Sequence, residues 1–387
     1  METNWLKYRW LLAVALAAMV LTASAETLMA PMRDGVKLAT DVYLPAGDGP
    51  WPVVLTRTPY NKKPYGGRSA QYTDHGYAFV AQDVRGKFES EGTYNPFEDD
   101  MNDGYDTVEW IAQQPFCDGK IGMTGASAMG ITSNLAAAAN PPHLVCAFVI
   151  VAPQSLFTQS RFIGGIFKES HAGGWMRQNG VPEAEINLYK KRAVMDERWK
   201  STDFVHFMHN VDIPIYNVGG WYDIFLQGNI DNYMFQQEHG KEGAAGNQKL
   251  RMGPFGHGNL SGDLEYPEAG GLAQFGEDEI RWFDHWLKGI DNGIMAGPPV
   301  QYYMMASARK GHVSDKNRWI AAEAWPPPST PTRFYLSQGR ALSSGPSKYK
   351  KAKTAYTADP KNPVPTVGGN ELLLEKGPMD QRAIPQR

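Results

Sequence analysis

The chain has very little cysteine. Of its 387 residues only Cys117 and Cys146 are cysteines, and neither has a CxxC partner. Two thiols are too few to form a cysteine-based metal cage. A disulfide between them is chemically permitted if the chain is exported. We expect free, buried thiols instead.

An excess of charge of either sign is also missing. The chain has 38 basic and 41 acidic residues, so its formal net charge is −3 at pH 7. No basic run resembles the electrostatic footprint of a nucleic-acid-binding protein. We therefore expect no nucleic acid among the partners.

Few side chains are spaced as metal ligands. His206 and His209 could face one ligand from a helix, but no third ligand lies near them in the sequence. The acids at 99, 100, 103 and 106 are not followed by a loop of EF-hand spacing, and charge at a helix N-terminus explains them. We expect neither a metal nor an organic cofactor.

Long hydrophobic runs are scarce too, and the one candidate lies at the N-terminus. Lys7 and Arg9 precede an apolar stretch at 11–21, which is followed by the small residues Ala23-Ser-Ala25. This pattern predicts a signal peptide cleaved after Ala25, because the stretch is shorter than the roughly 20 residues of a membrane span. We expect export to the periplasm or the cell exterior, with no stable membrane span after cleavage.

What the sequence does contain is a regular alternation of apolar strands and amphipathic helices. Strands are expected at 36–44, 51–56, 76–82, 121–124, 145–152, 213–218 and 249–252, and helices at 103–114, 134–139, 223–239 and 276–288. Alternation of this kind predicts an α/β fold with a doubly wound, mostly parallel sheet. We assign this catalytic domain to residues 26–300.

Two regions depart from the alternation. Residues 155–210 are rich in aromatic residues and glycine and then become charged and helical, which predicts a helical cap inserted above the end of a strand. Residues 301–387 are rich in proline, serine and glycine, and we expect a linker with short strands such as 332–336. A lone hairpin is marginal in water, so this region is expected to be loosely docked or incomplete.

A serine occupies the sharpest turn of the expected sheet. In Gly125-Ala-Ser-Ala-Met-Gly130 the apolar stretch meets a cluster of small residues and then an alanine-rich run. Small residues are needed where a strand and the following helix nearly touch, and a serine at such a turn exposes its hydroxyl above the sheet. Ser127 is therefore the candidate nucleophile.

Nucleophilic serine chemistry requires a histidine base and a carboxylate that orients it. Asp223 follows the expected strand at 213–218 through a glycine turn, and His257 follows the strand at 249–252. The order serine, acid, histidine is that of an α/β-hydrolase. We predict a triad of Ser127, Asp223 and His257.

Four sequence blocks make this interpretation more specific. They are Tyr77-Ala-Phe-Val-Ala-Gln-Asp-Val-Arg-Gly-Lys-Phe-Glu-Ser-Glu-Gly92, Cys117-Asp-Gly-Lys-Ile-Gly-Met-Thr-Gly-Ala-Ser127, Gly219-Gly-Trp-Tyr-Asp223 and Trp282-Phe-Asp-His-Trp-Leu-Lys-Gly289. In these four blocks the chain resembles the cocaine esterase and X-prolyl dipeptidyl-peptidase family of α/β-hydrolases. This family includes glutaryl acylases and α-amino acid ester hydrolases. The blocks occur in family order between residues 28 and 300.

The resemblance implies the same triad and adds an oxyanion hole formed by the Ala128 N–H and the Tyr60 hydroxyl. A tyrosine O–H can donate to an oxyanion. The family usually has tyrosine directly after the nucleophile, where this chain has Ala128. Family members also end in a large β-sandwich, and this chain stops at Arg387, partway into that region. We therefore expect a truncated C-terminal β region.

The substrate pocket is the least specific prediction. Trp175 and Phe162 in the cap, and Trp221 beside the candidate acid, are candidate pocket residues. Ordinary core packing is the alternative for each of them.

We therefore expect a secreted serine hydrolase that acts on small esters or amides. Assembly into a homo-oligomer is compatible with the sequence. One alternative is a dipeptidyl aminopeptidase of the same fold, which needs an anionic subsite such as Glu183 or Glu185. A second is a non-catalytic binding protein on this fold, against which an intact triad argues.

Overall fold

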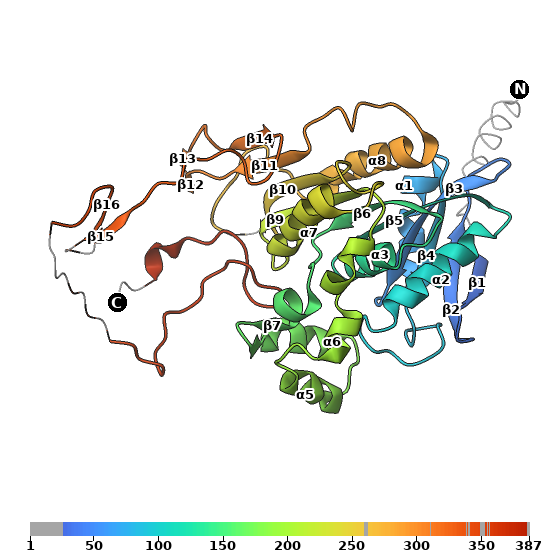
Figure 1. The fold of residues 1–387 in the computed structure, drawn as a ribbon, viewed down its shortest axis with the longest axis horizontal. Helices are drawn as coiled ribbons and strands as arrows, with labels where there is room; N and C mark the ends of the chain where they lie inside the picture. The colour runs from blue at the N-terminus through green and yellow to red at the C-terminus, as the bar shows by residue number, and fades with distance from the viewer. Residues whose placement is uncertain are drawn as a thin grey trace, which may run out of the picture.

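The structure is a computed structural model that describes residues 26–258, 262–309, 311–337, 339, 341–348, 353, 355 and 357–384. The expected signal peptide, residues 1–25, lies outside the described residues. Figure 1 shows a layered α/β body from which the C-terminal region extends to one side.

The body is built on one 10-stranded sheet in the order β1-β2-β4-β3-β5-β6-β9-β10-β11-β14. The strands from β4 to β11 run parallel, while β1, β2 and β14 are antiparallel at the two edges. The strands are β1 Glu26–Pro31, β2 Lys37–Tyr43, β3 Trp51–Thr58, β4 Ala78–Asp83, β5 Cys117–Ala126, β6 Leu144–Ile150, β9 Ile215–Tyr222, β10 Lys249–Gly256, β11 Val300–Met304 and β14 Arg318–Ala322.

Helices cover both faces of the sheet, as a doubly wound fold requires. One face carries α2 Asp100–Ala112, α3 Ala128–Ala139 and α7 Leu226–His239, and the other carries α1 Ala70–Thr73 and α8 Gly276–Lys288 (Figure 1). Because both faces are covered, the central strands are largely buried, and all six residues of β4 are buried. The predicted α/β class and the central strands and helices are confirmed.

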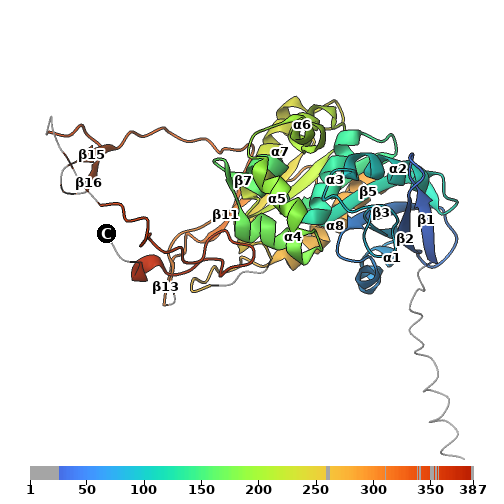
Figure 2. The ribbon, with the colours of Figure 1, turned by 90° about the horizontal axis from the view of Figure 1, so that it is seen from below.

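The expected cap lies over one end of the sheet (Figure 2). It contains α4 Gly174–Gln178, α5 Glu183–Lys191, α6 Glu197–Thr202 and a hairpin of β7 Phe162–Ile163 with β8 Ile166–Phe167, which pairs separately from the main sheet. Short 3-10 or π-helical turns join these elements: η2 Leu156–Arg161, η3 Glu169–Gly173, η4 Phe204–His206 and η5 Met208–Asn210. Similar turns outside the cap are η1 Lys63–Arg68, η6 Leu272–Phe275 and η7 Gln381–Ala383.

The sheet continues beyond the domain boundary that we placed at residue 300. β11 pairs with β10, and β14 pairs with β11, so the last strand of the sheet ends at Ala322. The proline-rich segment that suggested a boundary follows this strand. Two small hairpins pair apart from the main sheet: β12 Ala308–Arg309 with β13 His312–Val313 lies in the chain between β11 and β14, and β15 Tyr335–Ser337 with β16 Ala341–Ser343 follows the proline-rich segment.

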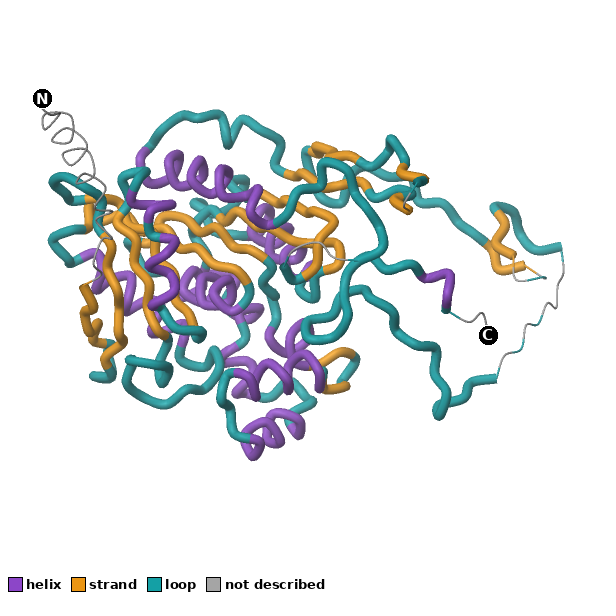
Figure 3. Tube along the Cα trace, turned by 180° about the vertical axis from the view of Figure 1, so that it is seen from behind, coloured by secondary structure: helices purple, strands orange, loops and turns teal. Residues whose placement is uncertain are grey.

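The C-terminal region then turns back toward the body (Figure 3). A bridge between Gly369 and Gly377 closes a loop, and Leu372 in this loop lies beside the cap. The chain after the sheet is therefore in contact with the region above Ser127.

Both cysteines are buried and free, which confirms that expectation. Among the described residues, no helix is long and apolar enough to cross a bilayer.

Candidate active site

Ser127 lies at the turn between β5 and α3. Its backbone has φ 60° and ψ −120°, a conformation that a residue with a side chain adopts only under strain. Its N–H donates to the carbonyl of Ile150 on β6 (2.9 Å). Its own carbonyl accepts a hydrogen bond from the N–H of Ile131 in the first turn of α3 (2.9 Å). The neighbouring strand and the new helix thus hold the strained turn in place.

The small residues around Ser127 are required by this close approach. A Cβ on Gly125 would lie 2.3 Å from the Cβ of Met129, and one on Gly130 would lie 2.8 Å from the Cβ of Ala152. Neither separation is tolerated by carbon atoms. The crowding explains why the sequence has glycine at both positions.

The three residues of the predicted triad meet at this turn. His257 Nε2 lies 2.7 Å from Ser127 Oγ, and His257 Nδ1 lies 2.6 Å from Asp223 Oδ2. Because an ionised carboxylate only accepts, Nδ1–H donates to Asp223, which leaves the Nε2 lone pair free to accept from the serine hydroxyl. The arrangement can therefore move a proton from Ser127 to His257.

Asp223 is held more firmly than its place in a loop suggests. It directly follows β9 and is only 2% exposed, and its Oδ1 accepts the amide of Phe225 (2.7 Å). The ring of Phe225 packs edge-on against His257, with 5.5 Å between the ring centroids. One residue thus fixes the carboxylate through its backbone and the imidazole through its side chain.

Tyr60 follows β3 and lies beside the same site. Its Oη accepts a hydrogen bond from the indole Nε1–H of Trp175 (2.6 Å). Burial of the hydroxyl raises the pKa of Tyr60, and hydrogen bonds with Trp175 and Ser127 act in the opposite direction. The phenol stays protonated at neutral pH, and because Trp175 occupies one lone pair, the O–H remains able to donate.

Ala128 is the first residue of α3 and is buried. The first N–H groups of a helix have no partner within the helix and carry partial positive charge. The Ala128 N–H is therefore a donor without a partner inside α3, directly beside Ser127 in the chain.

A small pocket opens beside Ser127 between the sheet and the cap. It is lined by Phe97, Ser127, Ala128, Ile131, Ser160, Arg161, His171, Trp175, Phe225 and Leu372. Trp175 was expected in the pocket and lies there. Its contact with Tyr60 was not foreseen, because it depends on how the cap folds over the sheet.

The structure brings neither of the other two candidates, Phe162 and Trp221, into the lining of this pocket. Phe162 is 1% exposed and packs in the cap core against Phe157 and Trp199. The indole N–H of Trp221 donates to the carbonyl of Tyr303 (2.8 Å), which directs that side chain toward β11 instead of Ser127. Both residues are packing residues, the alternative we had left open.

Sequence reasoning missed Phe97, Arg161, His171 and Leu372, which come from four separate segments of the chain. No local pattern marks them. Phe225 was the residue that could have been found, because it lies two positions after Asp223.

His171 provides a test of the polarity of this pocket. Its side chain is buried, and burial together with the cations of Lys168 and Arg161 and the neighbouring His257 lowers the pKa of His171 to about 3. An unfolded histidine has a pKa of about 6.5. Between these values the unfolded chain binds a proton that the folded chain does not, so stability falls as the pH decreases.

We therefore predict that His171→Asn reduces the loss of stability in acid. Between about pH 7.5 and about pH 4 the native protein should lose roughly 3 kcal/mol more than the variant. Urea unfolding of both proteins at the two pH values measures this difference. Parallel losses in the two proteins would show that His171 is not held neutral.

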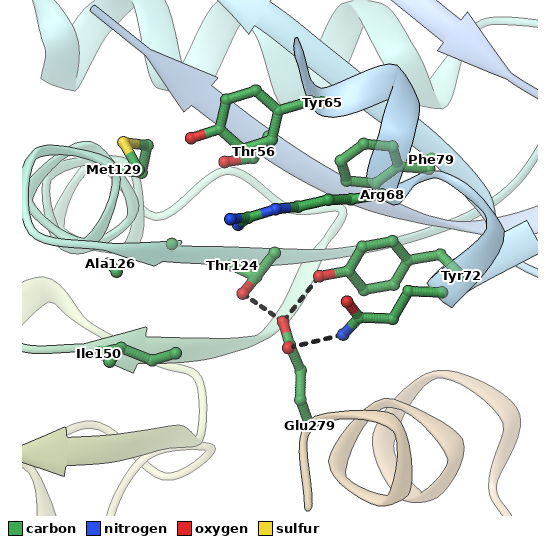
Figure 4. Close-up of a pocket in the computed structure, with 12 residues that line it drawn as sticks. Thr56, Tyr65, Arg68, Tyr72, Phe79, Thr124, Ala126, Met129, Ile150 and Glu279 are labelled. Atoms are coloured by element: carbon green, nitrogen blue, oxygen red, sulfur yellow. Dashed lines mark hydrogen bonds between the residues drawn. The ribbon is translucent and has the colours of Figure 1, made fainter. Parts of the chain in front are cut away.

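A second cavity lies on the other side of the turn (Figure 4). The carboxylate of Glu279, on α8, accepts hydrogen bonds there from Tyr72 Oη (3.0 Å), Gln71 Nε2 (3.3 Å) and the hydroxyl of Thr124. Burial raises the pKa of Glu279. Because Thr124 lies three residues before Ser127, this contact ties α8 to the strand that carries the serine.

Two protein-family models match the chain. The model of a family described as X-Pro dipeptidyl-peptidase (S15 family) matches residues 34–185 and 178–259. The model of the X-Pro dipeptidyl-peptidase C-terminal non-catalytic domain matches residues 292–363. The first match alone spans more than half of the chain.

Individual relatives agree with these matches. A cocaine esterase of Rhodococcus sp. (strain MB1 Bresler) is 29% identical over 94% of this chain and 72% of its own length. A solved α-amino acid ester hydrolase has a TM-score of 0.71 and 25% identity, covering 91% of this chain and 67% of its own. A CocE/NonD family hydrolase from Staphylococcus aureus has a TM-score of 0.66 and 21% identity, and the match covers 82% of this chain and 59% of that one. The chain thus spans roughly 60–70% of the length of these proteins.

Proposed function

Because the chain belongs to the X-Pro dipeptidyl-peptidase (S15) family of serine hydrolases, we propose that it cleaves carboxylic esters or amides through an acyl-enzyme on Ser127. The observation that carries the proposal is the unbroken hydrogen-bond chain from Asp223 through His257 to Ser127. Such a chain is what nucleophilic serine chemistry requires.

In the first half of the proposed reaction, His257 Nε2 takes the proton of Ser127 as Oγ attacks the substrate carbonyl. The Tyr60 O–H and the Ala128 N–H stabilise the oxyanion of the tetrahedral intermediate, since both are donors held in place before the reaction begins. The imidazolium then gives its proton to the departing alcohol or amine. Asp223 keeps Nδ1 protonated and stabilises the imidazolium.

In the second half, a water molecule takes the place of the departed group. His257 removes a proton from this water as it attacks the acyl carbonyl, and the same proton returns to Ser127 Oγ when the acid product leaves. Each proton taken is thereby returned within one turnover.

Two observations favour an esterase or acylase over a dipeptidyl aminopeptidase. The peptidase needs a carboxylate to hold the amino group of its substrate, and the described residues that line the pocket include none. Glu183 lies on α5 and pairs with Arg177 (2.8 Å), and Glu185 on the same helix is exposed. The cationic side chain of Arg161 instead lines the pocket.

A substrate panel tests the proposal. The purified chain should hydrolyse 4-nitrophenyl acetate and butanoate, and should turn over glycyl-prolyl 4-nitroanilide much more slowly. The opposite order would establish the aminopeptidase. A well-folded sample that cleaves no ester and no amide would instead favour the non-catalytic alternative.

A further inference from the structure

Arg161 is a charged residue of the pocket lining that the reaction above does not use. It ends the short turn η2 in the cap, is only 3% exposed, and lines the same pocket as Ser127 and Ala128. Arginine is almost never buried to this extent without a partner for its charge. A partner that neutralises this guanidinium is therefore expected.

The described residues offer few partners to the Arg161 guanidinium. Nη1 donates to the hydroxyl of Ser160 (3.1 Å), and the guanidinium lies over the rings of Phe97 and Trp175, at 5.8 and 5.5 Å from their centroids. Within the described parts of the chain, no carboxylate lies within ion-pair distance of Arg161. A guanidinium has five N–H donors, so most of its hydrogen-bonding capacity is unused.

The acid that acts electrostatically on Arg161 is already engaged elsewhere. Asp203 accepts from the amide of Leu156 (2.8 Å) and from the hydroxyl of Ser155 (2.7 Å). It holds the start of η2, the turn that Arg161 ends. Its carboxylate stabilises the backbone of the cap and is not free to pair with the pocket.

The other buried arginine of the fold shows the difference. Arg57 is fully buried as well, but its Nη1 lies 3.0 Å from the carboxylate of Asp100 and its Nε donates to Gln82 (2.8 Å). The guanidinium of Arg57 thus pairs with a carboxylate and donates to a side-chain amide. The guanidinium of Arg161 has neither kind of partner among the described residues.

The surroundings of Arg161 also favour a negative charge. His171 lines the pocket, and its buried Nδ1 has no hydrogen-bond partner among the described residues. The Ser160 hydroxyl and the N-terminal end of α3 also favour a negative charge in the pocket, because both supply hydrogen-bond donors at the edge of a space of low polarity. An anion that entered here would meet donors and no described acid.

We propose that Arg161 binds a carboxylate of the substrate while the scissile carbonyl lies on Ser127, so that the substrates are short esters or amides bearing a second, ionised carboxyl group. A guanidinium and a carboxylate match in geometry and form two parallel charge-assisted hydrogen bonds. The pocket beside Ser127 is small, which limits the bound group to a short chain. The inference rests on the proposed function and assigns Arg161 as its specificity-determining residue.

Pairs of isosteric esters test this inference with the full chain. Monoethyl succinate is compared with ethyl 4-methylpentanoate, in which an isopropyl group replaces the carboxylate. A second pair, 3-acetoxypropanoate and isopentyl acetate, places the same difference on the alcohol half. We expect the anionic member of one pair to have the higher kcat/KM by about 30-fold or more, as for a buried charge pair, and the pair that shows it identifies which half of the substrate reaches Arg161.

Variants assign the preference to one side chain. Arg161→Met should remove it by lowering kcat/KM for the anionic ester about 30-fold or more, while the neutral ester changes less than about threefold. Arg161→Lys should keep part of the preference, because an ammonium cannot donate two parallel hydrogen bonds. Arg177→Met is the matched control, since Arg177 is an exposed cap arginine paired with Glu169 and Glu183, and it should leave the preference unchanged.

Inhibition supplies a measurement that needs no variant. Succinate should inhibit hydrolysis of the neutral ester competitively and far more strongly than 4-methylpentanamide, which carries no carboxylate. Equal kcat/KM within both pairs, equal inhibition by succinate and 4-methylpentanamide, or equal losses for both esters in Arg161→Met would each overturn the inference. In those cases neutral esters are still cleaved and the proposed function stands, whereas absence of turnover on all four esters would remove both.

Discussion

Replacing Ser127 by alanine is expected to lower kcat for ester hydrolysis by about 10⁶-fold, the loss that follows removal of a nucleophilic serine. Alanine keeps the size that the crowded turn between Gly125 and Gly130 demands, so the fold should be retained. KM should change little, because the pocket and the oxyanion donors remain. Steady-state kinetics on an ester of known turnover measures the change.

The matched control for this variant is Ser133→Ala. Ser133 lies on the same helix, is buried, and donates to the carbonyl of Met129 (2.8 Å) instead of to a catalytic group. It should keep native kcat. If the Ser127 variant retained more than a hundredth of native kcat, the nucleophile would have to be sought elsewhere in the pocket.

Asp223→Asn is expected to lower kcat by about 10⁴-fold while the geometry is kept. The asparagine oxygen can still accept the amide of Phe225, as Oδ1 of Asp223 does. Its NH₂ group then faces Nδ1 of His257, and two donors cannot share one hydrogen bond. The imidazole therefore takes the tautomer with a proton on Nε2, which cannot accept the proton of Ser127.

Asp118→Asn serves as the comparison for the loss of one carboxylate. Asp118 is exposed and lies at the end of β5 opposite to Ser127, where it accepts the amide of Lys120 (3.0 Å). It should leave kcat unchanged. Retention of kcat within tenfold in Asp223→Asn would show that another group orients the histidine.

The central sheet could be predicted because the apolar pattern of each buried strand is visible within a short stretch of sequence. β6 and the first four residues of β4 are covered on both faces and are therefore continuous apolar runs, which the sequence displays directly. Ser127, Asp223 and His257 each directly follow a parallel strand of the sheet, and the carboxyl ends of parallel strands meet at one edge of a sheet. Their convergence follows from strand direction alone.

The pocket could not be predicted in the same way. Trp221 lies next to the acid in the sequence, yet its side chain leaves β9 toward Tyr303. No local sequence pattern marks Arg161, and its lack of a carboxylate partner among the described residues depends on where Asp203 and the sheet come to lie. Such facts depend on tertiary packing, which no spacing of residues within one segment expresses.

The boundary of the sheet was misplaced for a related reason. β14 lies at the edge, and none of its five residues is fully buried. An edge strand with one covered side lacks the apolar run that marks β4. The composition change near residue 300 therefore appeared to precede a linker, whereas two further strands join the sheet first.

The central claim is that the hydroxyl of Ser127 is the nucleophile, and covalent labelling tests it most directly. The purified chain and its Ser127→Ala variant are incubated with a fluorophosphonate, and the modified peptide is located by mass spectrometry. We predict one adduct on Ser127 in the native chain and none in the variant. Full labelling of the variant, or an adduct on a different residue of the native chain, would contradict the account.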